Sequence, residues 1–352
     1  MNLFTPFRLR GIELKNRIAV SPMCEYSAKD GHPSAWHLVH LGSRAVGGAA
    51  LVMAEATGVQ AIGRISPADT GLYLDSHVEA WKPIVQFICE QGAFAGIQLA
   101  HAGRKASTAA PWFGGGPIAV SDGGWEPMAP SPVPFDAGYT TPKELTAGEI
   151  DQIVADFVAA ARRALRAGFQ VAEIHGAHGY LLHEFYSPLS NQRADEYGGS
   201  FENRIRLLLR VTKAVREVWP EQQPVFVRIS ATDWKEGGWD LEQSVELCSR
   251  LKELGVDLVD VSSGGVVPGV SIPVAPGYQV GFAATIRREV GIATGAVGVI
   301  TDPAQAETII GTEQADIVLL AREMLRDPYW PRRAAQELGA KIKPPVQYHR
   351  AW

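Results

Sequence analysis

The sequence is short of cysteine and has no long apolar run. Its three cysteines, Cys24, Cys89 and Cys248, form no C-x-x-C pair and no even-numbered set, which argues against a disulfide-stabilised fold. No window approaches the roughly 18 apolar residues of a membrane span, and the first residues lack the basic and apolar regions of a signal peptide. We therefore expect a cytoplasmic protein that holds Cys89 and Cys248 in its core.

Excess positive charge and a dinucleotide-binding fingerprint are also missing. The formal charge of -5 is spread along the chain, so nothing indicates binding to nucleic acid or to an anionic membrane. No G-x-G-x-x-G follows the first expected strand, which argues against a Rossmann fold. The sequence therefore indicates a globular protein whose partners are small molecules.

Eight strand patterns alternate with helical patterns or Gly/Pro-rich loops. The helices include one opened by a capping box at Thr146 and Glu149 and one capped by Ser76 that ends at Glu90. Alternation favours a parallel sheet, and eight units favour a single (β/α)8 barrel with a hairpin over 3–18 covering one end. The expected strands are 17–22, 50–54, 95–99, 171–174, 224–230, 258–262, 295–298 and 317–320.

A long insertion follows the third strand. Residues 106–145 are rich in Pro and Gly with interspersed aromatic residues, too long for a plain connection and too apolar for a disordered linker. We interpret them as a lid or a subunit contact within one domain that spans 1–352.

The fourth strand runs into a cluster of titratable rings. His175 and His178 could each donate a hydrogen bond to one oxygen, and the Tyr180 hydroxyl could deliver a proton on the same side. Two other interpretations stay open for this segment. It could be a zinc site, with His183 or Glu184 as further candidate ligands, or the rings could only satisfy buried backbone groups.

Other polar side chains are expected at the same end of the barrel. Loops after the carboxyl ends of the strands build the active sites of such barrels. Arg228 lies inside an apolar strand, so it requires a buried acceptor. The residues that this rule places together are Cys24, Tyr26, Gln98, Lys105, His175, His178, Tyr180 and Arg228.

The loops after the last two strands are candidates for binding a phosphate. Backbone donors at helix starts and the Arg322 guanidinium could hold it, although Gly298 could be only a turn residue and Arg322 only a surface charge. Flavin mononucleotide (FMN) carries such a phosphate, and its ring could contact the polar groups in the middle of the open end of the barrel. Gln98 can pair with the imide edge of the flavin ring, and Arg228 can stabilise the negative charge that collects there on reduction. Spacing alone leaves other phosphorylated cofactors open.

Seven motifs in the same order resemble the Old Yellow Enzyme family, and more narrowly its bacterial thermophilic-like subgroup. The resemblance implies an FMN-dependent ene-reductase in a (β/α)8 barrel. NADPH or NADH would reduce non-covalently bound FMN, which would then reduce the C=C bond of an α,β-unsaturated carbonyl compound in a ping-pong mechanism. Nitro compounds and quinones are further candidate acceptors. The motifs are SPMC (21–24), GIQLAHAGRK (96–105), HGAHGY (175–180), SPLSN (187–191), DEYGGS (195–200), VRISA (227–231) and PVQYHRAW (345–352).

The resemblance also implies roles for individual residues. His175 and His178 would hold the substrate carbonyl oxygen, and Tyr180 would protonate the α-carbon. Tyr26 would add a hydrogen bond near that oxygen, and Cys24 would contact the flavin and tune its potential. The residues implied to bind FMN are Ser21, Pro22, Met23, Cys24, Ala56, Gln98, Arg228, Gly298, Ala321 and Arg322.

Two further residues are implied to bind substrate. They are Lys105 and Arg350, and in this subgroup the terminal arginine reaches from one subunit into the site of its neighbour. The resemblance therefore implies a homodimer or homotetramer in which the tail, 339–352, contacts the neighbouring subunit. It implies no metal. Ala321 stands where relatives often have glycine before the phosphate-binding arginine.

Two other functions stay open when the residues are considered alone. A flavin-free barrel could act on a sugar phosphate, with Lys105 or the histidines as acid-base groups. Alternatively, the chain could be a module that binds flavin or contacts quinones without turnover of its own.

Overall fold

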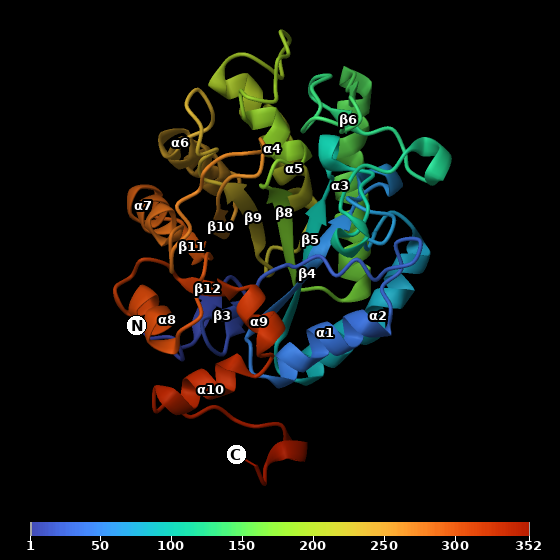
Figure 1. Cartoon of the computed structure of the whole chain (residues 1–352). Helices are drawn as coiled ribbons and strands as arrows, with labels where there is room; N and C mark the ends of the chain where they lie inside the picture. Colours follow the sequence, from blue (N-terminus) through green and yellow to red (C-terminus); the bar gives the residue numbers. More distant parts are fainter. Residues whose placement is uncertain (1, 352) are drawn as a thin grey trace.

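The computed structural model describes residues 2–351 and contains a closed barrel of eight parallel strands. The last strand pairs with the first and closes the ring, which helices surround (Figure 1). The predicted (β/α)8 barrel is therefore confirmed. In order around the ring, the strands are β3 (Ile18–Val20), β4 (Leu51–Gly58), β5 (Phe94–Ala100), β8 (Val171–Gly176), β9 (Val225–Ser230), β10 (Leu258–Ser262), β11 (Ala293–Ala296) and β12 (Ile317–Leu320).

The surrounding helices each bury one face against the strands. In α3, for example, Ile150, Ile153 and Phe157 are buried at helical spacing, and each such side chain stabilises the fold by roughly 1.5–3 kcal/mol. The helices are α1 (Ala35–Val46), α2 (Asp75–Glu90), α3 (Ala147–Ala167), α4 (Leu181–Tyr186), α5 (Phe201–Val218), α6 (Leu241–Glu253), α7 (Val280–Val290), α8 (Pro303–Gly311), α9 (Arg322–Arg326) and α10 (Trp330–Glu337).

The starts of two helices test the capping predictions. Thr146 caps α3, because its hydroxyl accepts a hydrogen bond from the Glu149 N–H at 3.3 Å and the Glu149 carboxylate accepts one from the Thr146 N–H at 2.9 Å. The prediction for α2 was wrong. That helix begins at Asp75, and the ring of His77 accepts from the Leu74 N–H at 3.4 Å, so the cap does not involve Ser76.

The amino-terminal hairpin closes one end of the barrel, as expected. Its strands are β1 (Phe7–Leu9) and β2 (Ile12–Leu14). Leu9, Ile12 and Leu14 are buried in one cluster with inward-facing apolar side chains of the barrel strands, among them Met53 and Phe226. Because this apolar cluster fills the lower barrel, polar chemistry is confined to the other end.

The seventh strand was predicted two residues too late. β11 ends at Ala296, and Gly298 has φ +119°, which belongs to a turn and not to a strand. The strand therefore lies two residues earlier than 295–298, and Gly298 lies in the loop that follows it.

The insertion at 106–145 contains only short elements. Trp112 and Phe113 are 60% and 79% exposed, yet the Trp112 ring contacts the edge of Tyr26 with centroids 5.8 Å apart. The elements are the 3-10 turns at Pro111–Phe113 and Val120–Asp122 and the paired strands β6 (Met128–Ala129) and β7 (Lys143–Glu144).

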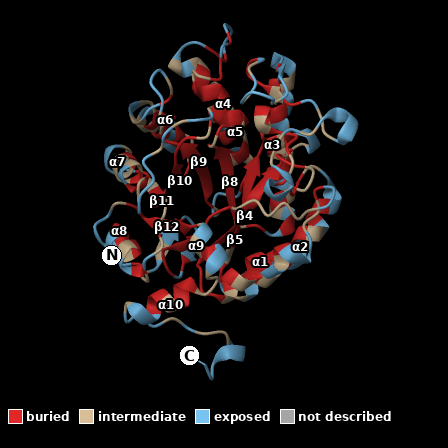
Figure 2. Ribbon diagram, in the orientation of Figure 1, coloured by how far each residue is buried: buried red, intermediate tan, exposed pale blue. Residues whose placement is uncertain are grey.

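The barrel and the tail differ in how far their residues are buried (Figure 2). The barrel strands are almost wholly buried, whereas residues 346–351 are exposed. Cys248 is buried and Cys89 is partly buried against the core, as expected. Among residues 2–351, no helix is long and apolar enough to cross a membrane.

Candidate active site

The predicted site residues gather at the carboxyl ends of the barrel strands. This end carries the loops that follow β3, β5, β8, β11 and β12, together with the last residues of β9 and β10. A parallel barrel brings these ends to one opening, which we call the mouth.

Three rings at the end of β8 and in the turn that follows it form the centre of the mouth. The centroids of His175 and His178 lie 5.3 Å apart, and those of His175 and Tyr180 lie 5.1 Å apart. The Nδ1 atom of His175 accepts a hydrogen bond from the Ala177 N–H at 3.3 Å, which leaves Nε2 as the donor of the neutral ring. One nitrogen of His178, Nε2, lies 2.7 Å from the Ser262 hydroxyl oxygen.

Burial determines the charge of these rings. It lowers the pKa of both His175 and His178 well below the ordinary value, and the nearby Arg228 charge lowers it further. Burial also raises the pKa of Tyr180 well above its ordinary value. At neutral pH the mouth therefore offers two uncharged imidazole donors and one protonated phenol.

The turn that carries His178 is held in an unusual backbone conformation. His178 has φ +60° and Gly179 has φ +73°, and left-handed geometry is uncommon for a residue with a side chain. The His178 N–H donates to the Ser230 hydroxyl at 2.9 Å. Gly265 packs so closely that a Cβ on it would lie 2.7 Å from the His178 backbone. Neighbouring loops therefore fix this turn.

Lys105, predicted to bind substrate, contacts the same turn. Its Nζ donates to the His178 carbonyl at 2.8 Å and to the Gly265 carbonyl at 3.1 Å, and it lies 5.0 Å from the centre of the Tyr180 ring. Burial lowers the pKa of Lys105 to about 8. Two of the three N–H donors of the ammonium group thus link the loops after β8 and β10. The third N–H is left for another acceptor.

His183 binds a carboxylate and a backbone amide. Its Nε2 lies 2.8 Å from Asp233 Oδ1, and its Nδ1 accepts from the Gly179 N–H at 2.9 Å. Both nitrogens are therefore occupied. Among residues 2–351, no group of three His, Cys, Asp or Glu side chains is placed to hold a metal ion. Sequence reasoning missed Asp233, which follows β9 and is far from His183 in the chain.

The loop after β3 forms an apolar side of the mouth. Cys24, Tyr26 and Tyr180 pack against a cluster of small buried residues that includes Ala56 and Ala100. Burial and the nearby Asp69 carboxylate raise the pKa of the Cys24 thiol, so Cys24 is not a nucleophile at neutral pH. Tyr26 has φ +45°, a second left-handed residue among the predicted set.

A layer of four polar side chains lies inside the barrel, between the apolar cluster and the mouth. Gln98 Nε2 donates to Glu173 Oε1 at 2.8 Å, and Arg228 Nε lies 3.1 Å from Asp260 Oδ2. Gln98 and Glu173 are neighbours in the β5–β8 pairing, and Arg228 and Asp260 are neighbours in the β9–β10 pairing. Asp260 is thus the ion-pair partner of buried Arg228, although the two groups are not aligned for a hydrogen bond. We call these four residues the polar layer.

The predicted phosphate-binding residues share one cavity. Gly298, Ala321 and Arg322 line a space of about 430 Å³ at the carboxyl ends of β11 and β12. Gly298 has φ +119°, which a residue with a side chain rarely adopts, and a Cβ there would lie 2.8 Å from the side-chain Nε2 of Gln279, so glycine is favoured there. Gln279 also lines this cavity and was missed, because it directly precedes α7 and does not follow a strand.

Arg350 does not reach the mouth of its own subunit. It lies in an exposed tail that follows α10 (Figure 1). The earlier part of that tail, 341–347, lines a cavity together with residues that precede β3, β4 and β5. The Tyr348 ring lies 6.4 Å from that of Tyr329, a residue that precedes α10. The last residue of the predicted tail, Trp352, lies outside the described residues.

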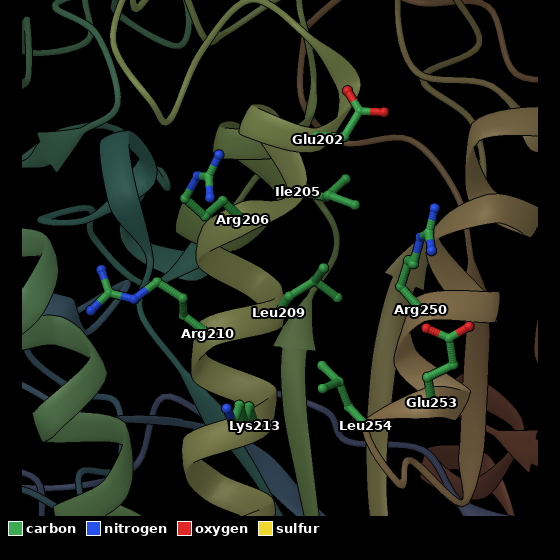
Figure 3. Close-up of a pocket in the computed structure, with 9 residues that line it drawn as sticks. All are labelled: Glu202, Ile205, Arg206, Leu209, Arg210, Lys213, Arg250, Glu253 and Leu254. Carbon is green, nitrogen blue, oxygen red and sulfur yellow. The ribbon is translucent and has the colours of Figure 1, made fainter.

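A separate groove lies between α5 and α6 on the outside of the barrel (Figure 3). It measures about 420 Å³, and Ile205, Leu209 and Leu254 form its apolar part while Arg206 and Arg250 stand among its charged residues. Its lining contains no histidine, cysteine or tyrosine. The reactive side chains are thus at the mouth and not in this groove.

A closed barrel with ionisable rings gathered at one mouth defines an α/β-barrel enzyme. Residues 2–341 match the NADH:flavin oxidoreductase / NADH oxidase family. The chain is 52% identical over 352 residues to an NADPH dehydrogenase of Geobacillus sp. (strain WCH70), covering 99% of this chain and 98% of that protein. It is 51% identical to an NADPH dehydrogenase of Listeria innocua, covering 99% of both chains.

Solved structures agree with this match. Morphinone reductase in complex with tetrahydroNAD superposes with a TM-score of 0.80 at 28% identity, covering 98% of this chain and 93% of that one. The old yellow enzyme homologue from Zymomonas mobilis gives a TM-score of 0.80 at 28% identity, covering 99% and 96%. The chain belongs to the NADH:flavin oxidoreductase family, also called the Old Yellow Enzyme family. Its class is therefore NAD(P)H:flavin oxidoreductase, as the resemblance implied.

Proposed function

We propose that the protein is an FMN-dependent ene-reductase that takes electrons from NADPH or NADH and reduces the C=C bond of α,β-unsaturated carbonyl compounds. The proposal rests on one observation above all: two neutral imidazoles and one phenol converge at the mouth. Family membership and the NADPH dehydrogenase names of the relatives support the choice of electron donor.

The mouth residues fit FMN because several of their polar atoms lack protein partners. Among residues 2–351, no hydrogen bond is made by the terminal nitrogens of Arg228 or by Gln98 Oε1, and the Ser21 hydroxyl is buried without a partner. A flavin ring offers complementary carbonyl and imide groups. The residues proposed to hold FMN are Ser21, Pro22, Met23, Cys24, Ala56, Gln98, Arg228, Gly298, Ala321 and Arg322.

The phosphate of FMN would lie in the cavity lined by Gly298 and Arg322. Among residues 2–351, the Arg322 guanidinium has no ion-pair partner, so its charge is available to an anion. The absence of a Cβ at Gly298 lets a ligand approach the backbone closely. Because a phosphate carries negative charge, this guanidinium favours its binding.

The rings would act on the alkene substrate. When bound, FMN would serve as a carrier that receives a hydride from the nicotinamide and delivers a hydride to the β-carbon of the alkene. His175 and His178 would each donate an N–H to the carbonyl oxygen, which withdraws electron density from the β-carbon. Tyr180, kept protonated by burial, would give its proton to the α-carbon. Tyr26 would add a further hydrogen bond near the oxygen.

A direct experiment tests this function. The purified protein should show flavin absorbance, lose it on anaerobic addition of NADPH or NADH, and regain it when cyclohexenone is added. A colourless protein that acts on a sugar phosphate would instead support a flavin-free barrel enzyme. A bound flavin that neither nicotinamide reduces would support a binding module without turnover.

We also propose that the insertion at 106–145 covers the mouth and that the tail completes a neighbouring site. The contact between Trp112 and Tyr26 supports the first part. Exposed apolar side chains on the tail support the second, because Val346 is 77% exposed and Tyr348 is 42% exposed. Arg350 would then enter the partner's mouth in a homodimer or homotetramer. Light scattering should show an oligomer, and Arg350→Ala should raise the KM for enones; a monomer with unchanged KM in the variant contradicts this.

A further inference from the structure

The polar layer contains more acidic groups than basic ones. It holds the carboxyl groups of Glu173 and Asp260 and only one guanidinium, that of Arg228. Glu173 and Asp260 have no solvent exposure, and Arg228 is 6% exposed. If both carboxyl groups were ionised, the interior would carry an uncompensated negative charge, which is very costly in a medium of low polarity.

Hydrogen bonding does not remove this imbalance. Among residues 2–351, Glu173 Oε2 and both carboxyl oxygens of Asp260 are buried without a hydrogen-bond partner, and so is Arg228 Nε. A carboxylate in this situation becomes stable by binding a proton. One of the two carboxyl groups therefore carries a proton at neutral pH.

The neighbours of Glu173 explain why this residue, and not Asp260, holds the proton. Gln98 faces it from β5, Arg228 from β9 and Asp260 from β10, while His175 lies two residues further along its own strand. Burial and then the Asp260 charge raise the pKa of Glu173 to about 8, opposed by Arg228 and Gln98. Burial raises the pKa of Asp260 to about 6, opposed by Arg228. Below the layer, the barrel is apolar.

The same guanidinium faces the layer and would face the proposed cofactor. Arg228 lies beside Asp260 through Nε, while among residues 2–351 its terminal nitrogens make no hydrogen bond. Negative charge that arrives at the mouth on reduction would compete for Arg228. Asp260, the carboxyl group that is still ionised, would then lose part of the positive field that keeps it ionised, and its affinity for a proton would rise.

We propose that Glu173 and Asp260 are tuning residues of the redox reaction: when two electrons reach the cofactor, this carboxyl pair takes up one proton from solvent and releases it on reoxidation. A carboxylate and a proton form a carboxylic acid, no other bond breaks, and the electrons come from the nicotinamide. This inference rests on the proposed function. Neither side chain touches substrate; they act through Arg228 and, for Glu173, through Gln98.

Potentiometric titration of the FMN-loaded protein between about pH 5.5 and 9 tests the proposal. The slope of the midpoint potential against pH gives the number of protons taken up per two electrons. Between about pH 6 and 8, the wild-type protein should take up more protons than Asp260→Asn, by up to one proton, because Glu173 already holds its proton and Asp260 is the carboxyl group left to accept one. Equal counts in the wild-type protein and Asp260→Asn would overturn the proposal.

Glu184→Gln is the matched control. Glu184 is also fully buried, and burial also raises its pKa to about 8, but its cationic neighbours are Arg104 and Lys105. This variant should keep the wild-type proton count. The same loss of protons in Glu184→Gln as in Asp260→Asn would show that the count does not depend on the polar layer and would overturn the proposal.

A second measurement keeps the proposal testable if Asp260→Asn fails to fold. Infrared difference spectra of the wild-type protein, reduced minus oxidised at about pH 7, should show a gain in the carbonyl band of a protonated carboxyl group. No gain would overturn the proposal. A protein without flavin would contradict the proposed function itself, whereas a flavin that turns over normally without this gain contradicts only the role of the layer.

Discussion

The Nδ1 atom of His183 accepts a hydrogen bond from the Gly179 N–H at 2.9 Å. The neutral His183 ring must therefore carry its proton on Nε2, which lies 2.8 Å from Asp233 Oδ1. Both side chains are fully buried. The turn between His178 and Tyr180, whose left-handed His178 costs on the order of 1–3 kcal/mol, is thus held by residues outside the predicted substrate contacts.

Asp233→Asn should slow alkene reduction by about 10- to 100-fold while preserving the fold. In the wild-type protein the Trp239 N–H donates to Asp233 Oδ2 at 2.7 Å. If the new amide keeps its oxygen toward His183, its NH2 group replaces Oδ2, and two N–H donors then face each other. If the amide is reversed, His183 takes the other tautomer and its Nδ1–H opposes the Gly179 N–H. Stopped-flow reoxidation by an enone measures the rate.

Ser187→Ala is the control for this prediction. It removes the hydroxyl that donates to Asp233 at 2.7 Å but leaves the carboxylate and its bond to His183. Its reoxidation rate should stay within a few fold of wild type. A wild-type rate in Asp233→Asn would show that the pair does not position the turn.

Tyr180→Phe should lower the rate of alkene reduction by roughly 10²- to 10⁴-fold, because it removes the proposed proton donor. Reduction of the flavin by NADPH should change little, since that step needs no proton from the phenol. Tyr26→Phe is the matched variant and should cost only a few fold. A larger loss in Tyr26→Phe than in Tyr180→Phe would reverse the two roles.

His178→Asn should weaken binding of a carbonyl ligand by about tenfold, the loss expected for a well-placed hydrogen bond. The affinity for FMN should fall much less, because His178 is proposed to contact the substrate oxygen. Ligand titration monitored by flavin absorbance gives the first value, and fluorescence of released FMN gives the second. Equal losses would contradict the assigned role.

Glu184→Gln should gain stability relative to wild type as pH rises from about 5 to 8. Burial raises the pKa of Glu184 to about 8, whereas the unfolded carboxyl ionises near pH 4.3. The unfolded state thus releases its proton first, and wild-type stability falls through this window by up to about 1.4 kcal/mol per pH unit. Urea unfolding at several pH values measures the difference; parallel curves for the two proteins would contradict the raised pKa.

Much of the architecture could be predicted because it depends on local patterns. Alternating strand and helix patterns give the barrel, and the strand-end rule brings His175, His178, Tyr180 and Arg228 to one mouth. The bounds of β11 were predicted two residues too late, because the turn that ends the strand depends on the backbone conformation of Gly298. The residue pattern does not determine that conformation.

Long-range partners could not be predicted from these patterns. The ion-pair partner of Arg228 comes from β10, and the partner of His183 follows β9; each pair forms only when the barrel closes. Lys105 matched the family motif, but its donors reach the His178 and Gly265 carbonyls, which no motif reveals. The individual site roles and the destination of Arg350 remain predictions.

The hairpin fills the lower end of the barrel with Leu9, Ile12 and Leu14, so a cofactor bound as proposed would be reached from the mouth. Nicotinamide and alkene would then have to occupy the same opening in turn. An excess of either one should therefore inhibit the reaction of the other.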